Sequence, residues 1–327
     1  MTSFIRRFGG ITGMLLIVLF FAINLPETFL TARNLLNISQ QISMLAVVAV
    51  TMTVVMVMGD FDLSVGAMAS LAGVVAATLF LAGWSIPAAV LVALLAGLAG
   101  GLFNGIMVSM VGILPFVATL ATLTLFSGIA FIISDGRTIF GRDIPDAFGD
   151  FARNGPVLAV VDERALVFPN LTIVAIIIAF LVWVVLEHTS YGRRLYAIGG
   201  NSEAARLAGL PVVGLRLSAF AFTGIGAAMA GLMYASRVAS ANPTQGDGLM
   251  LTAIAAVFLG MTITRDGQPR VLATLAGVAI LGVLDNGLTQ MRFDSYVREV
   301  LVGAIILLAV GMSALSRRGW SLKAPKS

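Results

Sequence analysis

The stretch from Leu63 to Ser134 contains no Asp, Glu, Lys or Arg. A soluble domain does not sustain so long an uncharged run, because its surface must carry charged side chains to face water. At about 20 residues for each helix that crosses a bilayer, the stretch holds about three membrane-spanning helices. Two pairs of turn-forming residues divide it, Gly83 with Pro87 and Gly112 with Pro115.

The composition of the whole chain indicates the same class of protein. Apolar residues make up 59% of the chain and charged residues 11%, and the mean hydropathy is +1.01. We therefore predict an all-α polytopic membrane protein. The 20 Lys and Arg outnumber the 16 Asp and Glu, and they gather in short loops and tails. This pattern indicates membrane orientation and not nucleic-acid binding.

About ten apolar segments are expected to cross the lipid bilayer, so that residues 1–327 form a single transmembrane domain. No small-residue cleavage site follows the first segment, which we expect to be a retained span and not a signal peptide. In the fourth span, Gly97, Gly101 and Gly105 share one face and allow another helix backbone to come close. The eighth segment is short, which suggests a broken or re-entrant helix. The predicted spans lie near Ile11–Leu25, Leu35–Met58, Ser64–Ala82, Ile86–Met110, Leu114–Ile133, Phe168–Leu186, Val212–Ser236, Leu249–Ile263, Val271–Gln290 and Tyr296–Leu315.

A weak internal similarity suggests two related halves. The segment Leu102–Met110 resembles Leu284–Met291, and both contain an Asn-Gly pair. Asp62 and Asp247 each precede an Ala-rich segment. The number of residues between them is nearly the same as the number between the two Asn-Gly pairs, at Asn104 and Asn286. Halves of five spans, residues 1–166 and 167–316, would be inverted relative to each other, with a site near the bilayer midplane. Chance similarity among helices rich in Gly, Ala and Leu is the alternative.

The most polar run between the apolar blocks is Tyr191–Arg216, which carries four arginines and a single acid. We predict two short helices around a break at Gly199 and Gly200, with Asn201 or Ser202 capping the second helix. A short, ordered, basic element between spans is typical of a docking surface for a soluble partner. The alternative is a solvated loop that merely follows the positive-inside rule.

Polar residues also collect at the predicted helix breaks. Amides, hydroxyls and isolated carboxylates suit hydrogen bonding to a polyhydroxylated neutral solute. The alternative is helix capping, by Asp62 or Ser64 for the helix near Val65 and by Asp247 for the helix near Leu249. The candidates for a substrate path are Asp62, Ser64, Asn104, Asn242, Thr244, Gln245, Asp247 and Asn286.

Several kinds of chemistry are not indicated by the sequence. It contains no G-x-x-x-x-G-K-[ST] phosphate loop, so we do not expect the chain to bind or hydrolyse ATP by itself. No catalytic constellation and no cofactor are predicted. With no cysteine and with His188 as its only histidine, the chain cannot build a thiolate or histidine metal cluster. The ionisable groups that a gradient-driven carrier needs inside its spans are also few.

Three stretches resemble the membrane permease subunits of ABC-type sugar importers, the family of the ribose, xylose, arabinose and galactose permeases. They are GDFDLSVG at 59–66, YAIGGNSEAARLAG at 196–209, and AIAAVFLG at 253–260 with GVLDNGL at 282–288 downstream. The likeness covers nearly the whole chain. Two departures are present: Asp60 stands where the family usually has Gly, and MTITRDGQPR at 261–270 replaces the usual G-G-T-S-L-x-G-G-R-G.

The resemblance implies a multi-pass protein of the bacterial inner membrane. From Arg6 and Arg7 ahead of the first span and from the distribution of Lys and Arg among the loops, we expect a cytoplasmic N-terminus and a basic cytoplasmic tail at 317–327. It implies a pair of permeases, as a homodimer, with a separate ATPase subunit and a periplasmic substrate-binding protein. The basic stretch is then expected to couple to the ATPase. Alternatives are an ABC permease for a branched-chain amino acid, a nucleoside or a quorum-signalling furanosyl compound, or an ion-gradient-driven carrier. The coupling candidates are Gly199, Gly200, Asn201, Glu203, Ala204, Ala205, Arg206 and Gly209.

Overall fold

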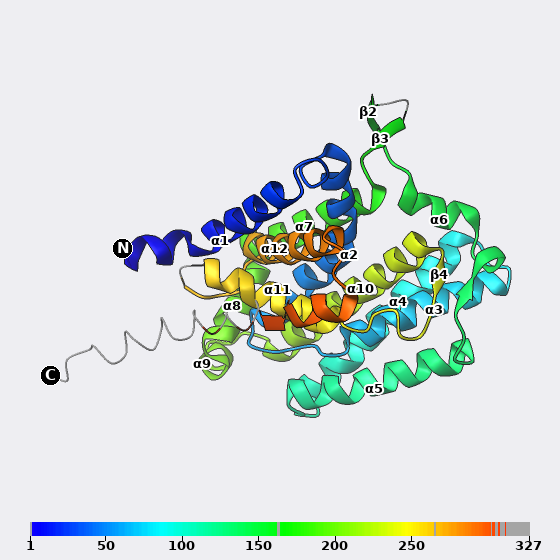
Figure 1. Cartoon of the computed structure of the whole chain (residues 1–327). Coiled ribbons are helices and arrows are strands. Elements are labelled where there is room, and N and C mark those ends of the chain that lie inside the picture. The colour runs from blue at the N-terminus through cyan, green and yellow to red at the C-terminus, as the bar shows by residue number, and fades with distance from the viewer. Residues whose placement is uncertain are drawn as a thin grey trace.

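The computed structural model describes residues 2–161, 164–264, 266–301, 303, 304, 307 and 311, and helices make up most of it (Figure 1). Each of the first nine predicted spans coincides with a helix. Only the first part of the tenth, near Tyr296–Leu315, is described together with a few later residues, and the tail 317–327 lies outside the described residues. The nine helices are α1 (Thr2–Asn24), α2 (Ala32–Met56), α3 (Val65–Leu81), α4 (Ile86–Ser109), α5 (Pro115–Ser134), α7 (Asn170–His188), α10 (Val212–Val238), α11 (Leu249–Ile263) and α12 (Val271–Gln290).

Six of the described helices, α2, α4, α5, α7, α10 and α12, are long and apolar enough to cross a membrane. The chain is therefore a polytopic helical membrane protein. Helices α3 and α11 are apolar too, but they contain only 17 and 15 residues. At about 1.5 Å per residue, neither reaches the roughly 30 Å thickness of the hydrocarbon core. Both follow an irregular segment, as expected for broken helices.

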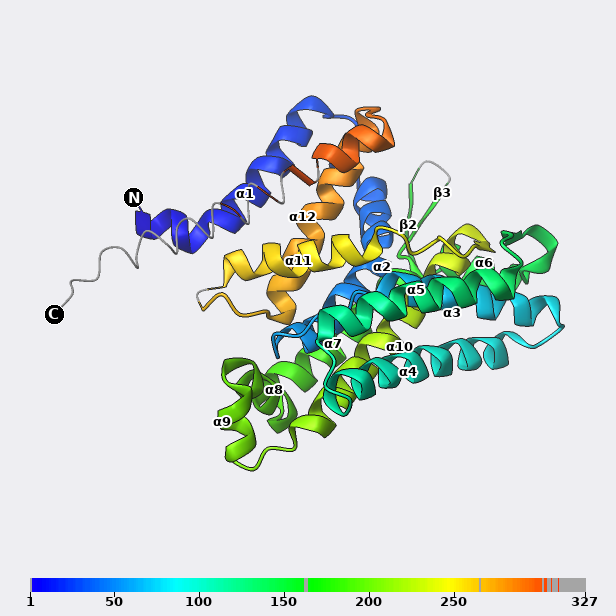
Figure 2. The same ribbon diagram turned by 90° about the horizontal axis from the view of Figure 1, so that it is seen from below.

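Helix α10 lies at the centre of the bundle, against α2, α3 and α4. The predicted glycine face of α4 makes this packing close: a Cβ on Gly97 would come within 2.6 Å of the Gly224 carbonyl oxygen. Further along the same face, Gly101 lies against Phe220 and Gly105 lies against Leu217. Figure 2 shows α4 and α10 running side by side. Small residues thus let the two backbones approach, as the spacing of the glycines predicts.

The connection between α5 and α7 folds over one end of the bundle. It contains β1 (Ile139–Phe140), a 3-10 turn (Gly141–Asp143), α6 (Asp146–Arg153), β2 (Val157–Val161) and β3 (Arg164–Val167). Strand β1 pairs with β4 (Ser240–Ala241), and β2 pairs with β3 in an antiparallel hairpin that projects from the bundle in Figure 1. On α6, Phe148 and Ala152 are buried against the bundle, which anchors the connection there.

The predicted basic stretch forms α8 (Ser190–Gly200) and α9 (Ser202–Leu207) at the opposite end of the bundle from α6 (Figure 2). Asn201 caps α9 as expected, since its Oδ1 accepts a hydrogen bond from the Ala204 N–H at 2.9 Å. The predicted break at Gly199 and Gly200 is wrong. Both glycines are the last residues of α8, and the chain leaves helical geometry at Asn201.

Candidate functional site

A buried hydrogen-bond network surrounds Asp62 in the irregular segment between α2 and α3. Asp62 is 1% exposed, and its Oδ1 accepts bonds from the Ser64 N–H at 2.9 Å and the Ser64 hydroxyl at 2.6 Å. Asn104 of α4 donates from Nδ2 to Ser64 Oγ at 2.8 Å and to Asp62 Oδ1 at 3.4 Å. The structure thus brings three predicted substrate-path residues together from two distant parts of the chain.

Two threonines of α5 complete this network, and sequence reasoning missed them. Thr122 donates to Asn104 Oδ1 at 2.7 Å, and Thr119 donates to the Phe61 carbonyl oxygen at 3.4 Å. Both side chains are buried. Their spacing of three residues in an otherwise apolar helix places them on one face, and this is the signal that could have identified them.

The alternative that these residues are helix caps is wrong, both for Asp62 and Ser64 at the start of α3 and for Asp247 at the start of α11. Ser64 occupies the N-cap position of α3, but its hydroxyl donates to Asp62 and makes no cap hydrogen bond. Asp62 accepts from Ser64, before the first helical residue. The N-cap of α11 is Gly248, with φ of 79° and no side-chain cap, so Asp247 does not cap that helix.

The second group of predicted path residues forms a compact turn before α11. Asn242 Oδ1 accepts from the N–H and the hydroxyl of Thr244, both at 3.0 Å, and Gln245 donates to the Ser240 carbonyl oxygen at 3.4 Å. Asp247 is exposed. Within the part of the chain that the structure describes, no hydrogen bond joins these side chains to the Asp62 network. The turn is held against α3 by a bond from the Gly246 N–H to the Ser70 hydroxyl oxygen at 2.7 Å.

Asn286, the remaining predicted path residue, lies in a separate cluster of carboxamides between α2 and α12. Its Oδ1 accepts from Gln290 at 2.8 Å and from Asn34 at 3.1 Å, and its Nδ2 donates to Gln41 at 3.5 Å. Asn286 is buried, and its three partners are partly buried. These amides satisfy one another and hold two helices together.

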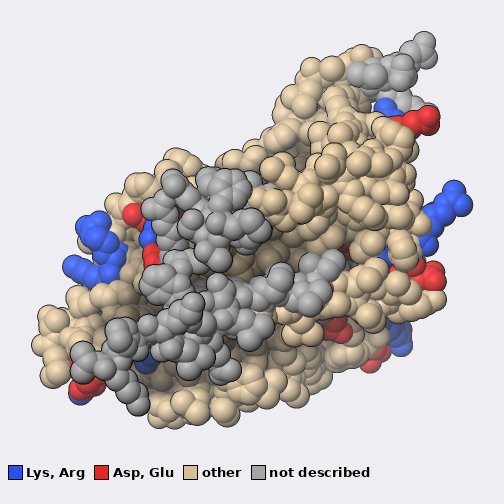
Figure 3. Space-filling model, turned by 60° about the vertical axis from the view of Figure 1, so that its left-hand side comes forward, with Lys and Arg blue, Asp and Glu red and all other residues tan. Residues whose placement is uncertain are grey.

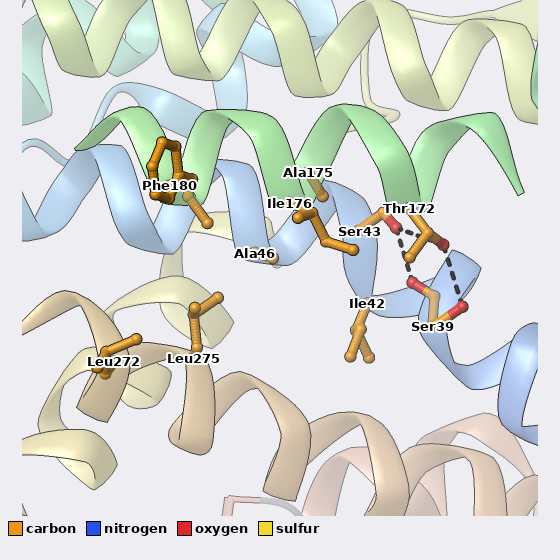
Figure 4. Close-up of a pocket in the computed structure, with 11 residues that line it drawn as sticks. Ser39, Ile42, Ser43, Ala46, Thr172, Ala175, Ile176, Phe180, Leu272 and Leu275 are labelled. Carbon is orange, nitrogen blue, oxygen red and sulfur yellow. Dashed lines mark hydrogen bonds between the residues drawn. The ribbon is translucent and has the colours of Figure 1, made fainter. Parts of the chain in front are cut away.

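A cavity of about 300 Å³ lies between α2, α7 and α12 and contains none of the predicted path residues. Figure 4 shows its hydroxyl groups gathered at one end, where Ser39 Oγ and Thr172 Oγ1 are 3.0 Å apart and Ser43 donates to Thr172 at 3.4 Å. The rest of the wall is apolar. The cavity is lined by Ser39, Ile42, Ser43, Ala46, Thr172, Ala175, Ile176, Ala179, Phe180, Leu272 and Leu275.

Helices α8 and α9 present both charged and apolar side chains to solvent. Glu203 and Arg206 form an exposed ion pair at 2.7 Å, and the hydrogen bond to Arg206 lowers the pKa of the Glu203 carboxyl. Ala205 points inward and is 6% exposed, so it holds α9 in place. Leu207 is 78% exposed, a large apolar side chain that the sequence interpretation missed. The other coupling candidates, Gly199, Gly200, Asn201, Ala204 and Gly209, are exposed.

The α8–α9 element is tied to the bundle at two places. A Cβ on Gly199 would overlap the carbonyl oxygen of Val57, so the end of α8 lies directly against the end of α2. The Tyr196 hydroxyl donates to the Pro269 carbonyl oxygen at 2.9 Å. Pro269 belongs to the turn between α11 and α12 in which the sequence departs from the sugar-permease pattern. The α8–α9 element therefore contacts the end of α2, which precedes the short helix α3, and the turn that follows the short helix α11.

Charged side chains on the face seen in Figure 3 lie mainly at its two ends, and uncharged atoms make up most of the described surface between them. This distribution suits a protein whose middle lies in a bilayer and whose ends lie in water.

Comparison with known proteins agrees with this picture. Residues 34–310 match the family described as "Branched-chain amino acid transport system / permease component". The chain is 35% identical over 306 residues to the ribose import permease protein of Bacillus subtilis (strain 168), covering 93% of this chain and 92% of that protein. It is 36% identical over 298 residues to the ribose import permease protein of Escherichia coli (strain K12), covering 90% of each.

A third relative is the D-allose transport system permease protein of Escherichia coli (strain K12), 32% identical over 310 residues, with 94% of this chain and 92% of that protein covered. No solved structure matches the chain. The resemblance to permeases of sugar importers that the motifs predict is confirmed. Because the family match extends over most of the chain, the chain belongs to the family of branched-chain amino acid transport system permease components, together with the ribose and D-allose permeases.

Proposed function

We propose that this chain is the membrane permease subunit of an ATP-driven ABC importer that carries a monosaccharide or related neutral polyol. The observation that carries the proposal is the buried network of Asp62, Ser64, Asn104 and Thr122 at a helix break. Such groups exchange hydrogen bonds readily with sugar hydroxyls. The relatives whose names specify ribose and D-allose support the same class of solute.

The fold that we propose has ten spans in two inverted halves, 1–166 and 167–316, with both termini in the cytoplasm of a bacterium and the chain in its inner membrane. Two features support it: α3 and α11 are both too short to span the membrane, and the start of α3 at Gly66 lies against Gly246 in the irregular segment before α11. Broken helices that meet near the midplane are typical of transporters with inverted repeats.

The path for the solute then includes both segments. The Asp62 network lies at one, and Asn242, Thr244, Gln245 and Asp247 lie at the other. Asn286 belongs to a carboxamide cluster that the solute meets at another level. Two copies of the chain would form the complete pathway as a homodimer.

ATP hydrolysis takes place in a partner subunit in this proposal, and a periplasmic substrate-binding protein delivers the solute. The α8–α9 element is the docking surface for the ATPase. Its exposed Leu207 beside the Glu203–Arg206 pair supports this role, because an apolar anchor with a polar rim is typical of protein interfaces. Motion of the ATPases would reach the bundle through α8 and switch it between its two openings.

The test is reconstitution of the permease with its ATPase and substrate-binding protein. Vesicles are loaded with ATP and offered labelled D-ribose, D-xylose, D-allose, leucine or a nucleoside, with and without an uncoupler of ion gradients. We expect uptake of one sugar that depends on ATP and on the ATPase and continues with the uncoupler. ATP-dependent uptake of leucine or a nucleoside would overturn the solute class, and accumulation by the purified chain alone would overturn the mechanism.

A further inference from the structure

Asp60 and Arg216 form an ion pair between segments that are 156 residues apart, in which Asp60 is buried and the Arg216 side chain is 25% exposed. Asp60, in the irregular segment between α2 and α3, is 4% exposed. Arg216 Nε lies 2.9 Å from Asp60 Oδ2, and Arg216 Nη2 donates to Asp60 Oδ1 at 3.5 Å. Only the Nη2 contact is a hydrogen bond, because Arg216 Nε and Asp60 Oδ2 have no hydrogen-bond partner, so the contact between Nε and Oδ2 is electrostatic. Asp60 is also one of the two places at which this sequence departs from the sugar-permease pattern.

Arg216 lies in the first turns of α10, a short distance along the chain from α9. Gly209, with φ of 83°, follows the end of α9, and Pro211 is the N-cap residue of α10. Ala205 of α9 and Leu215 of α10 are buried in one cluster with Leu195 of α8. The guanidinium is thus attached to a packed cluster that joins α8, α9 and the start of α10 and that also includes Val57 and Met58 at the end of α2.

Asp60 is also linked along the chain to the hydrogen-bond network around Asp62. It lies two residues before Asp62, and the intervening Phe61 is held in two directions. Its carbonyl oxygen accepts from Thr119 of α5 at 3.4 Å, and its ring lies 6.1 Å from that of Phe258 of α11. A displacement of Asp60 would therefore change the positions of the side chains that surround Asp62.

We infer that Asp60 and Arg216 are a positioning pair, which transmits the movement of α8 and α9 to the polar network around Asp62 during transport. This inference rests on the proposed function. In a medium of low dielectric constant the attraction between the two charges is strong and falls with their separation, and a separated carboxylate would be left buried without a cation. The irregular segment must then follow Arg216 when the α8–α9 element moves.

The pair works in parallel with the backbone contact between Gly199 and Val57. That contact holds the end of α8 against the end of α2, and the buried side chains of Leu195, Ile198 and Val57 pack in one cluster there. The ion pair adds a charged link between the start of α10 and the segment that carries Asp62.

The test uses the reconstituted complex of permease, ATPase and binding protein, and the sugar that the parental complex takes up from D-ribose, D-xylose and D-allose. Three variants are compared with the parent: Asp60→Asn, Arg216→Asp, and the double exchange Asp60→Arg with Arg216→Asp. Asp150→Asn in α6 is the matched control, since it removes a carboxylate from an exposed ion pair with Arg153 at the other end of the bundle. The readouts are ATP hydrolysed per sugar taken up, co-purification of the ATPase, and the melting temperature.

For Asp60→Asn we expect about a tenfold rise in ATP hydrolysed per sugar, the scale of a coupling free energy between two sites. The ATPase should still co-purify. The double exchange should restore part of the parental ratio, which a loss of stability alone would not explain. Asp150→Asn should keep the ratio of the parent.

A parental ratio for Asp60→Asn would overturn the inference while leaving the proposed function intact. The same holds if the single variants raise the ratio only in proportion to a lower melting temperature and the double exchange restores nothing. A parental complex that neither hydrolyses ATP nor takes up any of the three sugars would overturn the proposed function, and the inference with it.

Discussion

Gly66 at the start of α3 and Gly246 ahead of α11 lie backbone to backbone. A Cβ on Gly66 would come within 2.6 Å of the Gly246 carbonyl oxygen, a distance at which the backbone has to shift. The Gly246 N–H is fixed in the same place by its bond to Ser70 Oγ. Because neither glycine has a side chain, the start of α3 and the segment before α11 can approach each other this closely.

The first prediction concerns this contact. Gly66→Ala should push α3 and α11 apart and lower the free energy of unfolding by about 1–3 kcal/mol, the usual cost of overpacking. Uptake by reconstituted vesicles should fall with it. Gly128→Ala in α5 is the control, because a Cβ there meets nothing within 4 Å. Equal melting temperatures for the two variants would show that the contact is not close.

The second prediction concerns the centre of the Asp62 network. Asn104→Leu removes the bonds to Asp62, Ser64 and Thr122 while keeping a similar volume, and leaves those buried groups with fewer partners. We expect a loss of about 1–3 kcal/mol in unfolding free energy, together with reduced uptake. Asp62→Ala should change both quantities in the same direction.

Thr124→Ala provides the comparison for the second prediction. Thr124 is exposed on α5, and its hydroxyl bonds only to the Leu120 carbonyl oxygen of its own helix. Chemical denaturation in detergent and sugar uptake should both stay at the parental level. Parental behaviour of Asn104→Leu in both assays would contradict a role for the network.

The third prediction separates docking from stability on α9. Glu203→Lys and Leu207→Asp change exposed side chains, so the melting temperature should stay near that of the parent. Both should reduce ATPase co-purification and uncouple ATP hydrolysis from uptake. Ala205→Glu should instead lower the melting temperature, since it places a carboxylate at a buried position.

Arg142→Glu is the control for charge reversal, at an exposed position on the other end of the molecule. It should leave ATPase co-purification unchanged. If Glu203→Lys and Leu207→Asp both retain the ATPase as the parent does, the docking surface lies elsewhere.

The fourth prediction is a pH dependence at Tyr196. Burial raises the pKa of its hydroxyl to about 12, and the nearby Glu187 adds to the effect. The folded protein therefore keeps this proton at pH values where the unfolded chain, with a pKa of 10.0, loses it. The stabilisation by Tyr196 is complete below pH 10.0 and is lost as the pH rises towards about 12.

Tyr196→Phe makes this measurable. The variant lacks the bond to Pro269 and should be less stable by about 1 kcal/mol at neutral pH. A rise of the pKa from 10.0 to about 12 costs the folded parent more than one hydrogen bond contributes, so the stability curves of parent and variant should converge and then cross within this pH range. Absorbance at the tyrosinate band should show one tyrosine fewer titrating near the upper end. A constant difference across this range would mean that the hydroxyl is not buried.

The sequence alone was sufficient for the approximate limits of the described apolar helices and for a side-chain cap at the start of α9. These properties depend on local chemistry. An uncharged run of sufficient length must lie in lipid as helix, and an Asn side chain can bond the N–H groups of the turn that follows it. The glycine face of α4 was predictable for the same reason, because it depends only on the helical period.

Which polar side chains meet was decided by the tertiary structure. Asp62, Asn104 and Thr122 come from three separate segments, whereas Asn286, expected in the same path, bonds to Asn34 and Gln290. The partner of Asp60 was likewise not predictable. Residue type sets what a side chain can bond to, but its neighbours depend on which helices pack together. In lipid, which helices pack together depends on how well their whole faces fit, and a single short motif does not specify a whole face.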